Sequence, residues 1–281
     1  MQDSLLQREK WVIISVLLIL SGVAWAFTVY QARMPAGMDM PTVSGQEAAP
    51  VAGMGEMHGG MLMAPDPTFQ GIEAALFLLM WVAMMIAMMF PSVYPMVLLF
   101  ARVSKGQAAQ SGASHVPTWI FVAGYLAIWT FFGGIAYPSL LGFRWLAAHI
   151  AWLGDHLPAI AALILIGAGI YQFSTWKRVC LVHCRSPFSF ILHKWRAGVS
   201  GAFRMGLEHG AYCVGCCWGL MIVLFAMGLM NLAWMGLLTA IIFAEKVTPY
   251  GTIFSRVTGG LLIVLGAAML LSPQLVPWLT G

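Results

Sequence analysis

Long apolar segments with almost no charged residues constrain this chain more than any other feature of its sequence. Trp11–Tyr30 contains no charged side chain, and a helix needs roughly 20 apolar residues to cross a bilayer core. Only 9% of the 281 residues are charged, against about a quarter in soluble domains. We therefore expect an all-α, polytopic bundle of about seven transmembrane helices. The other candidate spans are Ile72–Phe100, Thr118–Phe143, Leu157–Thr175, Tyr212–Met230, Leu232–Val247 and Val257–Ser272.

The distribution of basic residues predicts how these helices are oriented. Lysine and arginine are retained on the cytoplasmic side of membrane proteins. If the N-terminus is cytoplasmic, only Arg33 and Arg144 of the 14 Lys and Arg residues lie outside. This pattern favours a multi-pass protein of the bacterial inner membrane. The net charge of +4 is explained by this orientation in the membrane, so the charge gives no indication of nucleic-acid binding.

The pattern of spans and connections divides the chain into three parts. Residues 1–30 form an N-terminal transmembrane anchor, residues 31–71 a methionine-rich extracytoplasmic loop, and residues 72–281 a metal-binding transmembrane bundle. The loop is rich in glycine, proline and methionine, so it cannot bury a core, and we expect it to be disordered. A basic cytoplasmic loop is expected over Trp176–Tyr212, and its LVHC and FRMGLEHG stretches could extend the neighbouring spans as helices.

The extracytoplasmic loop contains candidate metal ligands. The pattern MGEMHGGM places Met54, Met57, His58 and Met61 close together. Thioether sulfur is soft and uncharged, so it suits Cu(I) and binds hard cations poorly. The alternative is a compositionally biased linker whose methionines bind nothing.

A second set of methionines lies within the span Ile72–Phe100. Met80, Met84 and Met88 are four residues apart, and Met85 and Met89 repeat that step on an adjoining strip. Because residues four apart share a helix face, these side chains would form a ladder of thioethers through the membrane. Methionine is also a pliable packing residue, so ordinary packing is the alternative to a metal pathway.

The densest group of candidate ligands is the YCVGCCW segment. Cys213, Cys216 and Cys217 are spaced so that their sulfurs share one face of a helix, and His209 lies one turn earlier. Such a group can bind a thiophilic metal. The alternative is that these cysteines are small buried hydrophobic residues.

Two further cysteines precede this segment. Cys180 and Cys184 flank His183, and all five cysteines belong to the same predicted cytoplasmic region. Disulfides are rare in that reducing compartment, and an odd number of cysteines cannot be fully paired. We expect Cys180 or Cys184 to approach the other cysteines in a site for Cu(I), with Zn(II) as the alternative.

Two ionisable residues end the predicted span Leu232–Val247. Glu245 and Lys246 lie at membrane depth, where ionisable side chains are candidates for a pathway. Because they are adjacent, they point to different helix faces. The alternative for Lys246 is a side chain that extends to the membrane surface.

Several of these patterns match a known family. They are AMMFP at 87–91, YQ at 171–172, K-x2-C-x3-CR-x-P at 177–187, H-G-x-Y-C-x-G-C-C-W-x-L-M at 209–221, GLMNLAWM at 228–235, and EK at 245–246. Over roughly residues 75–270 the chain resembles an uncharacterised bacterial family of predicted metal-binding integral membrane proteins. The resemblance implies a metal site at the cysteines. It implies no particular ion or reaction.

Three functions remain open from the sequence. The leading one is transport or relay of Cu(I) from extracytoplasmic methionines to cytoplasmic-side cysteines. The alternative is an assembly factor or accessory subunit of a membrane metalloenzyme, whose partners would be those subunits or a metallochaperone besides lipid and metal. The third is a quinone-dependent thiol oxidoreductase. No ATP-binding, Ser-His-Asp or paired-carboxylate pattern indicates a pump or a hydrolase.

Overall fold

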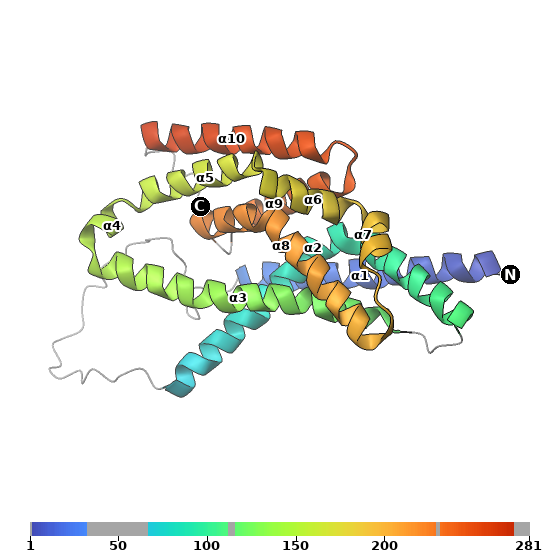
Figure 1. The fold of residues 1–281 in the computed structure, drawn as a ribbon. Coiled ribbons are helices and arrows are strands. Elements are labelled where there is room, and N and C mark those ends of the chain that lie inside the picture. Colours follow the sequence, from blue (N-terminus) through green and yellow to red (C-terminus); the bar gives the residue numbers. More distant parts are fainter. Residues whose placement is uncertain (1, 33–66, 112–115, 229–230, 273–281) are drawn as a thin grey trace.

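The computed structural model describes residues 2–32, 67–111, 116–228 and 231–272. All regular structure within these ranges is helical, which confirms the all-α prediction. The helices are α1 (Gln2–Ala32), α2 (Pro67–Ser111), α3 (Thr118–His149), α4 (Ala151–Asp155), α5 (Leu157–Gln172), α6 (Thr175–Arg185), α7 (Pro187–Lys194), α8 (Gly198–Met227), α9 (Leu232–Val247) and α10 (Gly251–Leu271) (Figure 1).

The number of membrane spans differs from the expected seven. Within the described residues, α1, α2, α3, α8 and α10 are long and apolar enough to cross a membrane. The α5–α6 pair, bent by 63°, adds a sixth span if the two helices are counted as one. The remaining candidate forms α9, which has 16 residues and falls short of the roughly 20 that a bilayer core requires.

The outer faces of the spanning helices match a lipid environment. On α1 the exposed side chains include Val12, Ile19 and Val23, and on α10 they include Leu261 and Val264. Exposing aliphatic residues along whole helix faces is unfavourable in water, whereas the hydrocarbon core of a bilayer solvates them well. The described helices thus have the character of a multi-pass membrane protein.

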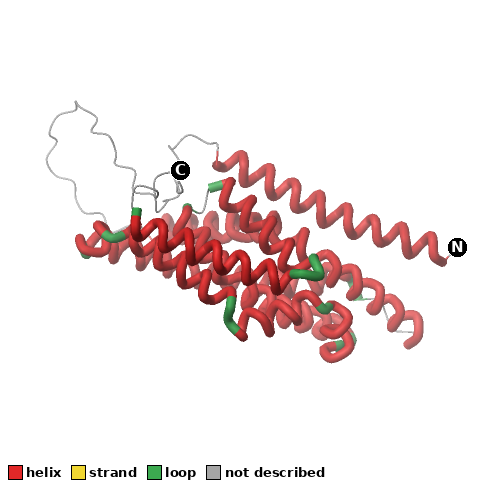
Figure 2. Tube along the Cα trace, turned by 90° about the horizontal axis from the view of Figure 1, so that it is seen from above, coloured by secondary structure: helices red, strands yellow, loops and turns green. Residues whose placement is uncertain are grey.

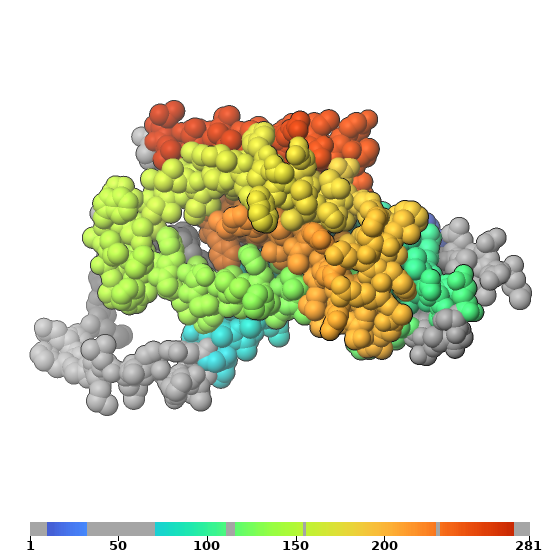
Figure 3. Space-filling model, viewed as in Figure 1, coloured from blue at the N-terminus to red at the C-terminus, as the bar shows by residue number. Residues whose placement is uncertain are grey.

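The helices associate in three main pairs. α3 packs along α8, α5 along α10, and α1 along α2. Figure 2 shows α1 at the edge of the bundle, and the face seen in Figure 3 is formed largely by α3, α5, α6 and α8. The buried core lies between α2, α3, α8 and α9, and this is where the candidate ligands of α2 and α8 are found.

A proline in α2 provides the attachment point for α1. Pro91 has no backbone N–H, so the carbonyl of Ala87, four residues earlier, lacks its usual helical partner. The Ser21 hydroxyl donates to that oxygen at 2.9 Å, and the Trp25 indole N–H donates to it at 3.2 Å. The carbonyl oxygen that Pro91 leaves unpaired therefore joins two helices in a region where water cannot satisfy it.

Glycines allow the backbones of α3 and α8 to approach closely. A methyl group on Gly206 of α8 would overlap the Phe121 carbonyl oxygen, and one on Gly124 of α3 would overlap the Phe203 carbonyl oxygen. Small residues at such crossings are the usual means of tight helix association in membranes. The close approach brings Tyr125 of α3 against the cysteine-bearing face of α8.

We expect Gly206→Ala to destabilise the protein by about 1–3 kcal/mol, because the added methyl group overpacks a backbone contact. The matched control is Gly134→Ala on α3, where an added methyl group meets no atom within 4 Å. Both changes improve helix propensity equally, by about 1 kcal/mol. The difference in stability between the two variants therefore measures the cost of the steric overlap at Gly206. Thermal unfolding of the purified protein in detergent measures it, and equal midpoints for the two variants would contradict the close packing.

The basic segment Trp176–Tyr212 is largely helical, and its LVHC and FRMGLEHG stretches lie in helices as the sequence allowed. It contains α6, α7 and the first half of α8. The Ser174 hydroxyl accepts a hydrogen bond from the Lys177 backbone N–H at 3.1 Å and so caps the start of α6. Cys180 and Cys184 therefore lie one turn apart on a helix.

Candidate metal centre

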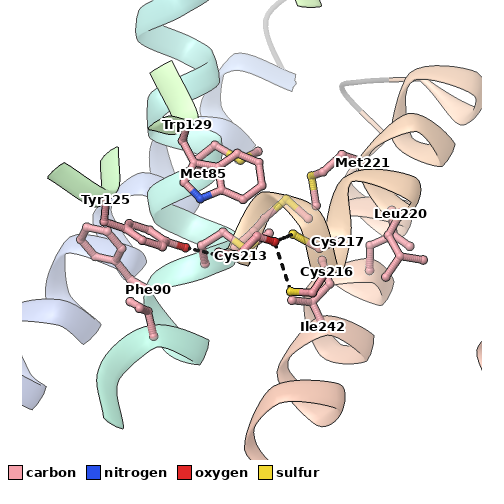
Figure 4. Packing of buried hydrophobic residues seen from close by; sticks show 14 of the residues in the cluster. Met85, Phe90, Tyr125, Trp129, Cys213, Cys216, Cys217, Leu220, Met221 and Ile242 are labelled. Atoms are coloured by element: carbon pink, nitrogen blue, oxygen red, sulfur yellow. Dashed lines mark hydrogen bonds between the residues drawn. The ribbon is translucent and has the colours of Figure 1, made fainter. Parts of the chain in front are cut away.

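The three cysteines of α8 lie on one buried face of that helix. Cys213, Cys216 and Cys217 are each 1% exposed. The thiols of Cys216 and Cys217 donate to the Cys213 carbonyl oxygen at 3.1 and 2.8 Å, as Figure 4 shows. All three cysteines lie within the continuous helix α8, where residues three and four apart share a face, so the predicted spacing produces the predicted common face.

The cysteines of α6 approach those of α8. The Cys184 and Cys216 sulfurs are 3.8 Å apart. Cys180 lies against Gly215, where a methyl group would come within 2.6 Å of its sulfur. The Tyr171 hydroxyl donates to the Gly215 carbonyl at 2.5 Å, which fixes α8 to the end of α5. The structure thus brings both cysteine groups together, and Cys184 is the α6 residue whose sulfur reaches the α8 thiols.

A buried lysine contacts the thiol cluster. The Lys246 ammonium is 2.8 Å from the Cys213 sulfur and 3.7 Å from the Met89 sulfur. The Tyr125 hydroxyl is 3.0 Å from the Cys213 sulfur. Among the described residues, no carboxylate lies within ion-pair distance of Lys246. An ammonium buried without a carboxylate favours negative charge on the sulfur beside it.

The neighbouring carboxylate points elsewhere. Glu245 forms an ion pair with Lys177 at 2.7 Å, and both side chains are buried. The second Glu245 oxygen and the Gln172 amide nitrogen have no hydrogen-bond partner within the described part of the chain. Glu245 and Lys246 therefore point to different faces of α9, as their adjacent positions predicted. Glu245 pairs with Lys177, so the charge of Lys177 is compensated there and not at the thiol cluster.

The methionines of α2 face the protein interior. Met80, Met84, Met85, Met88 and Met89 are all buried, with exposures between 0% and 5%. Figure 4 shows the Met85 side chain beside the α8 cysteine face. The ladder is therefore directed into the bundle, and its Met89 end reaches the cysteine cluster through the contact of Met89 with Lys246.

The two candidate histidines differ in position. His209 is buried one turn before Cys213, among the rings of Phe121, Tyr125 and Phe190. Its Nδ1 atom has no hydrogen-bond partner among the described residues. A buried, unpartnered imidazole nitrogen is unfavourable unless a ligand satisfies it, so His209 remains a candidate ligand.

His183 is held by contacts with Tyr212 and Val179. Its ring stacks on that of Tyr212 with centroids 4.5 Å apart, and its Nδ1 bonds the Val179 carbonyl at 2.8 Å. These contacts occupy both the ring face and one nitrogen. The loop candidates Met54, Met57, His58 and Met61 lie outside the described residues.

Comparison with known proteins identifies the family. The family model described as a copper chaperone, PpoB2, matches residues 78–269. The chain belongs to this family. The matched range includes all five cysteines and the five methionines of the α2 ladder, and it excludes α1 and the methionine-rich loop. Searches of the curated proteins and of the solved structures found no match.

The donor atoms at the centre of this copper chaperone family member suit a soft ion. Thiolates and thioethers select Cu(I) over hard cations, and the cluster combines cysteine sulfur with the Met89 sulfur. Within the described residues, no three His, Cys, Asp or Glu side chains are already arranged as a metal-binding group. Two thiols instead donate to a carbonyl, and bound metal would replace their protons.

Sequence reasoning missed two residues of this centre. Met221 follows Cys217 by one helical turn and is fully buried, so it extends the sulfur stripe of α8 towards the methionines of α2 (Figure 4). The four-residue spacing of Cys213, Cys217 and Met221 could have revealed it. Tyr125, in contrast, lies 88 residues from Cys213, and nothing in its local sequence marks it.

Proposed function

We propose that this protein binds Cu(I) at the sulfur cluster between α6 and α8 and relays the ion along the thioethers of α2. The observation that supports the proposal best is the 3.8 Å separation of the Cys184 and Cys216 sulfurs. Two thiols from different helices at this separation can share one soft ion after a small side-chain rotation. Cys213 and Cys217, on the same face as Cys216, supply further donors.

Membership of a copper chaperone family favours Cu(I) over the alternative, Zn(II). Structural zinc sites use four cysteine or histidine ligands in tetrahedral arrangement. Cu(I) is satisfied by fewer donors and accepts thioether sulfur, which the buried methionines beside the cluster offer. Cys180 and His209 are additional candidate ligands in this proposal, because each lies one helical turn from a cysteine of the cluster.

The relay depends on an ordered change in donor strength. Neutral thioethers bind Cu(I) weakly and release it, whereas thiolates hold it tightly. The buried ladder Met80–Met84–Met88, with Met85 and Met89 beside it, would take the ion towards the cysteines. The loop residues Met54, Met57, His58 and Met61 would capture copper outside the bacterial inner membrane, if the N-terminus is cytoplasmic as the basic residues predict.

Anaerobic titration of the purified full-length protein with Cu(I), against a chromogenic chelator, tests the proposal. We expect a single tightly bound ion per chain, with a sulfur-dominated shell in X-ray absorption at the copper edge. Zn(II) should compete poorly. Preferential binding of Zn(II), or a copper shell of nitrogen and oxygen only, would contradict the assignment.

A second candidate function is an assembly factor that delivers copper to a membrane metalloenzyme. The family description as a copper chaperone favours it. The two functions differ in what deletion of the chain changes in cells. Loss of a relay lowers total cell copper, whereas loss of an assembly factor leaves total copper unchanged and lowers the copper content of the membrane-protein fraction.

A further inference from the structure

We propose that Lys246 determines the charge of the ion that the sulfur cluster accepts. On this inference, which rests on the proposed function, its ammonium makes the centre select a monovalent soft cation over a divalent one. No catalytic step is involved. Lys246 acts as a fixed positive charge beside the ligands.

The inference begins from the position of the ammonium group. Its nitrogen lies 2.8 Å from the Cys213 sulfur and 3.7 Å from the Met89 sulfur, so it contacts donors of α8 and α2 together. The side chain is 8% exposed. An ion bound by either sulfur would therefore lie within a few ångströms of this charge, with little water to screen it.

The other buried cation nearby is already neutralised. Lys177 is paired with Glu245 at 2.7 Å, and the Arg185 guanidinium donates to the Thr248 and Pro249 carbonyls. Lys246 has sulfur partners only among the described residues. Two cysteine thiolates, this ammonium and a monovalent ion together have no net charge, whereas a divalent ion leaves an uncompensated positive charge in a low-dielectric interior.

The contribution of Lys246 itself disfavours a divalent ion more than a monovalent one, whatever the number of thiolates. Coulomb energy is proportional to the charge of the ion, so Lys246 opposes a divalent ion twice as strongly as a monovalent one. At a separation of about 4–6 Å and an effective dielectric constant of about 20, each unit of charge corresponds to roughly 100- to 1000-fold in affinity. Removing the charge should therefore shift selectivity and not merely weaken binding.

Ag(I) and Cd(II) provide a matched pair of probes, because they have the same number of electrons, are both thiophilic, and differ in charge. Purified full-length protein in detergent is titrated with each ion by calorimetry. We expect wild-type protein to prefer Ag(I), and Lys246→Gln to shift the ratio of the two affinities towards Cd(II) by roughly 100- to 1000-fold. Glutamine retains a donor for the Cys213 sulfur, so the shift would report charge alone.

Two further variants complete the design. Lys246→Arg keeps the charge and should keep the wild-type ratio. Lys194→Met removes an exposed lysine that pairs with Glu208 at 3.5 Å, and it should also leave the ratio unchanged. Lys246→Met provides a second neutral side chain should the glutamine variant not fold.

The outcomes separate the inference from the function beneath it. An unchanged Ag(I)/Cd(II) ratio in a folded neutral variant would overturn the role of Lys246 and leave copper binding intact. Loss of selectivity in Lys246→Arg would likewise overturn it, because the charge is still present. Wild-type protein that binds neither ion would overturn the proposed function itself.

Discussion

Replacing Cys213, Cys216 and Cys217 together with alanine should abolish tight Cu(I) binding. These residues supply most of the thiols at the centre, and each is 1% exposed, so no water or surface group can substitute for them. Metal–thiolate sites with four ligands are stabilised by about 10–16 kcal/mol in total. Losing three donors should therefore lower the affinity by more than about 1000-fold.

Single substitutions on α6 provide a graded comparison for that result. Cys184→Ala should weaken Cu(I) binding more than Cys180→Ala, because the Cys184 sulfur lies 3.8 Å from that of Cys216. The two cysteines lie one turn apart on α6, so the changes are otherwise alike. Chelator competition measures the affinities, and helical content confirms that each variant is folded. Tight copper binding by the triple variant would place the ion elsewhere in the chain.

Replacing Met84 and Met88 together with leucine should reduce copper uptake by more than about 10-fold while the cysteine cluster still binds Cu(I). Both methionines are buried, at 2% and 0% exposure, in the middle of the α2 ladder. Leucine preserves volume and apolarity, so the change in stability should stay under about 1.5 kcal/mol per site. What is removed is sulfur, and with it the weak intermediate sites that a relay requires.

Uptake into cells or reconstituted vesicles measures this effect, with copper binding by the purified variant measured beside it. The matched control is Met269→Leu on α10, a methionine that is equally buried but lies outside the α2 ladder. It should leave uptake unchanged. If the Met84/Met88 variant takes up copper at the wild-type rate, these methionines serve only in packing. The assembly function would then be preferred.

The contacts at the centre explain which of its features could be predicted. The common face of Cys213, Cys216 and Cys217 follows from helical spacing alone, because their carbonyl bonds span three and four residues. The ladder of α2 follows from the same periodicity. Met221 obeys this rule too and could have been included.

The partners of the basic residues could not be predicted from the local sequence. Lys177 lies in the first turn of α6 and Lys246 in the last turn of α9, yet the first pairs with Glu245 and the second contacts Cys213. Which cation meets which anion depends on how α6, α8 and α9 are rotated about their axes. That rotation is set by packing, including the glycine crossing of α3 and α8.

The sequence by itself determined the properties that depend on composition and on spacing within a helix. Helical, membrane-embedded character follows because each backbone group must be satisfied inside its own segment in lipid, and the cysteine face follows from the helical repeat. Tertiary structure alone decided that Cys184 meets Cys216, that α1 attaches at the carbonyl freed by Pro91, and that Lys246 lies among sulfurs. Each of these joins residues 32 to 66 positions apart, and only the packing of whole helices brings such residues together.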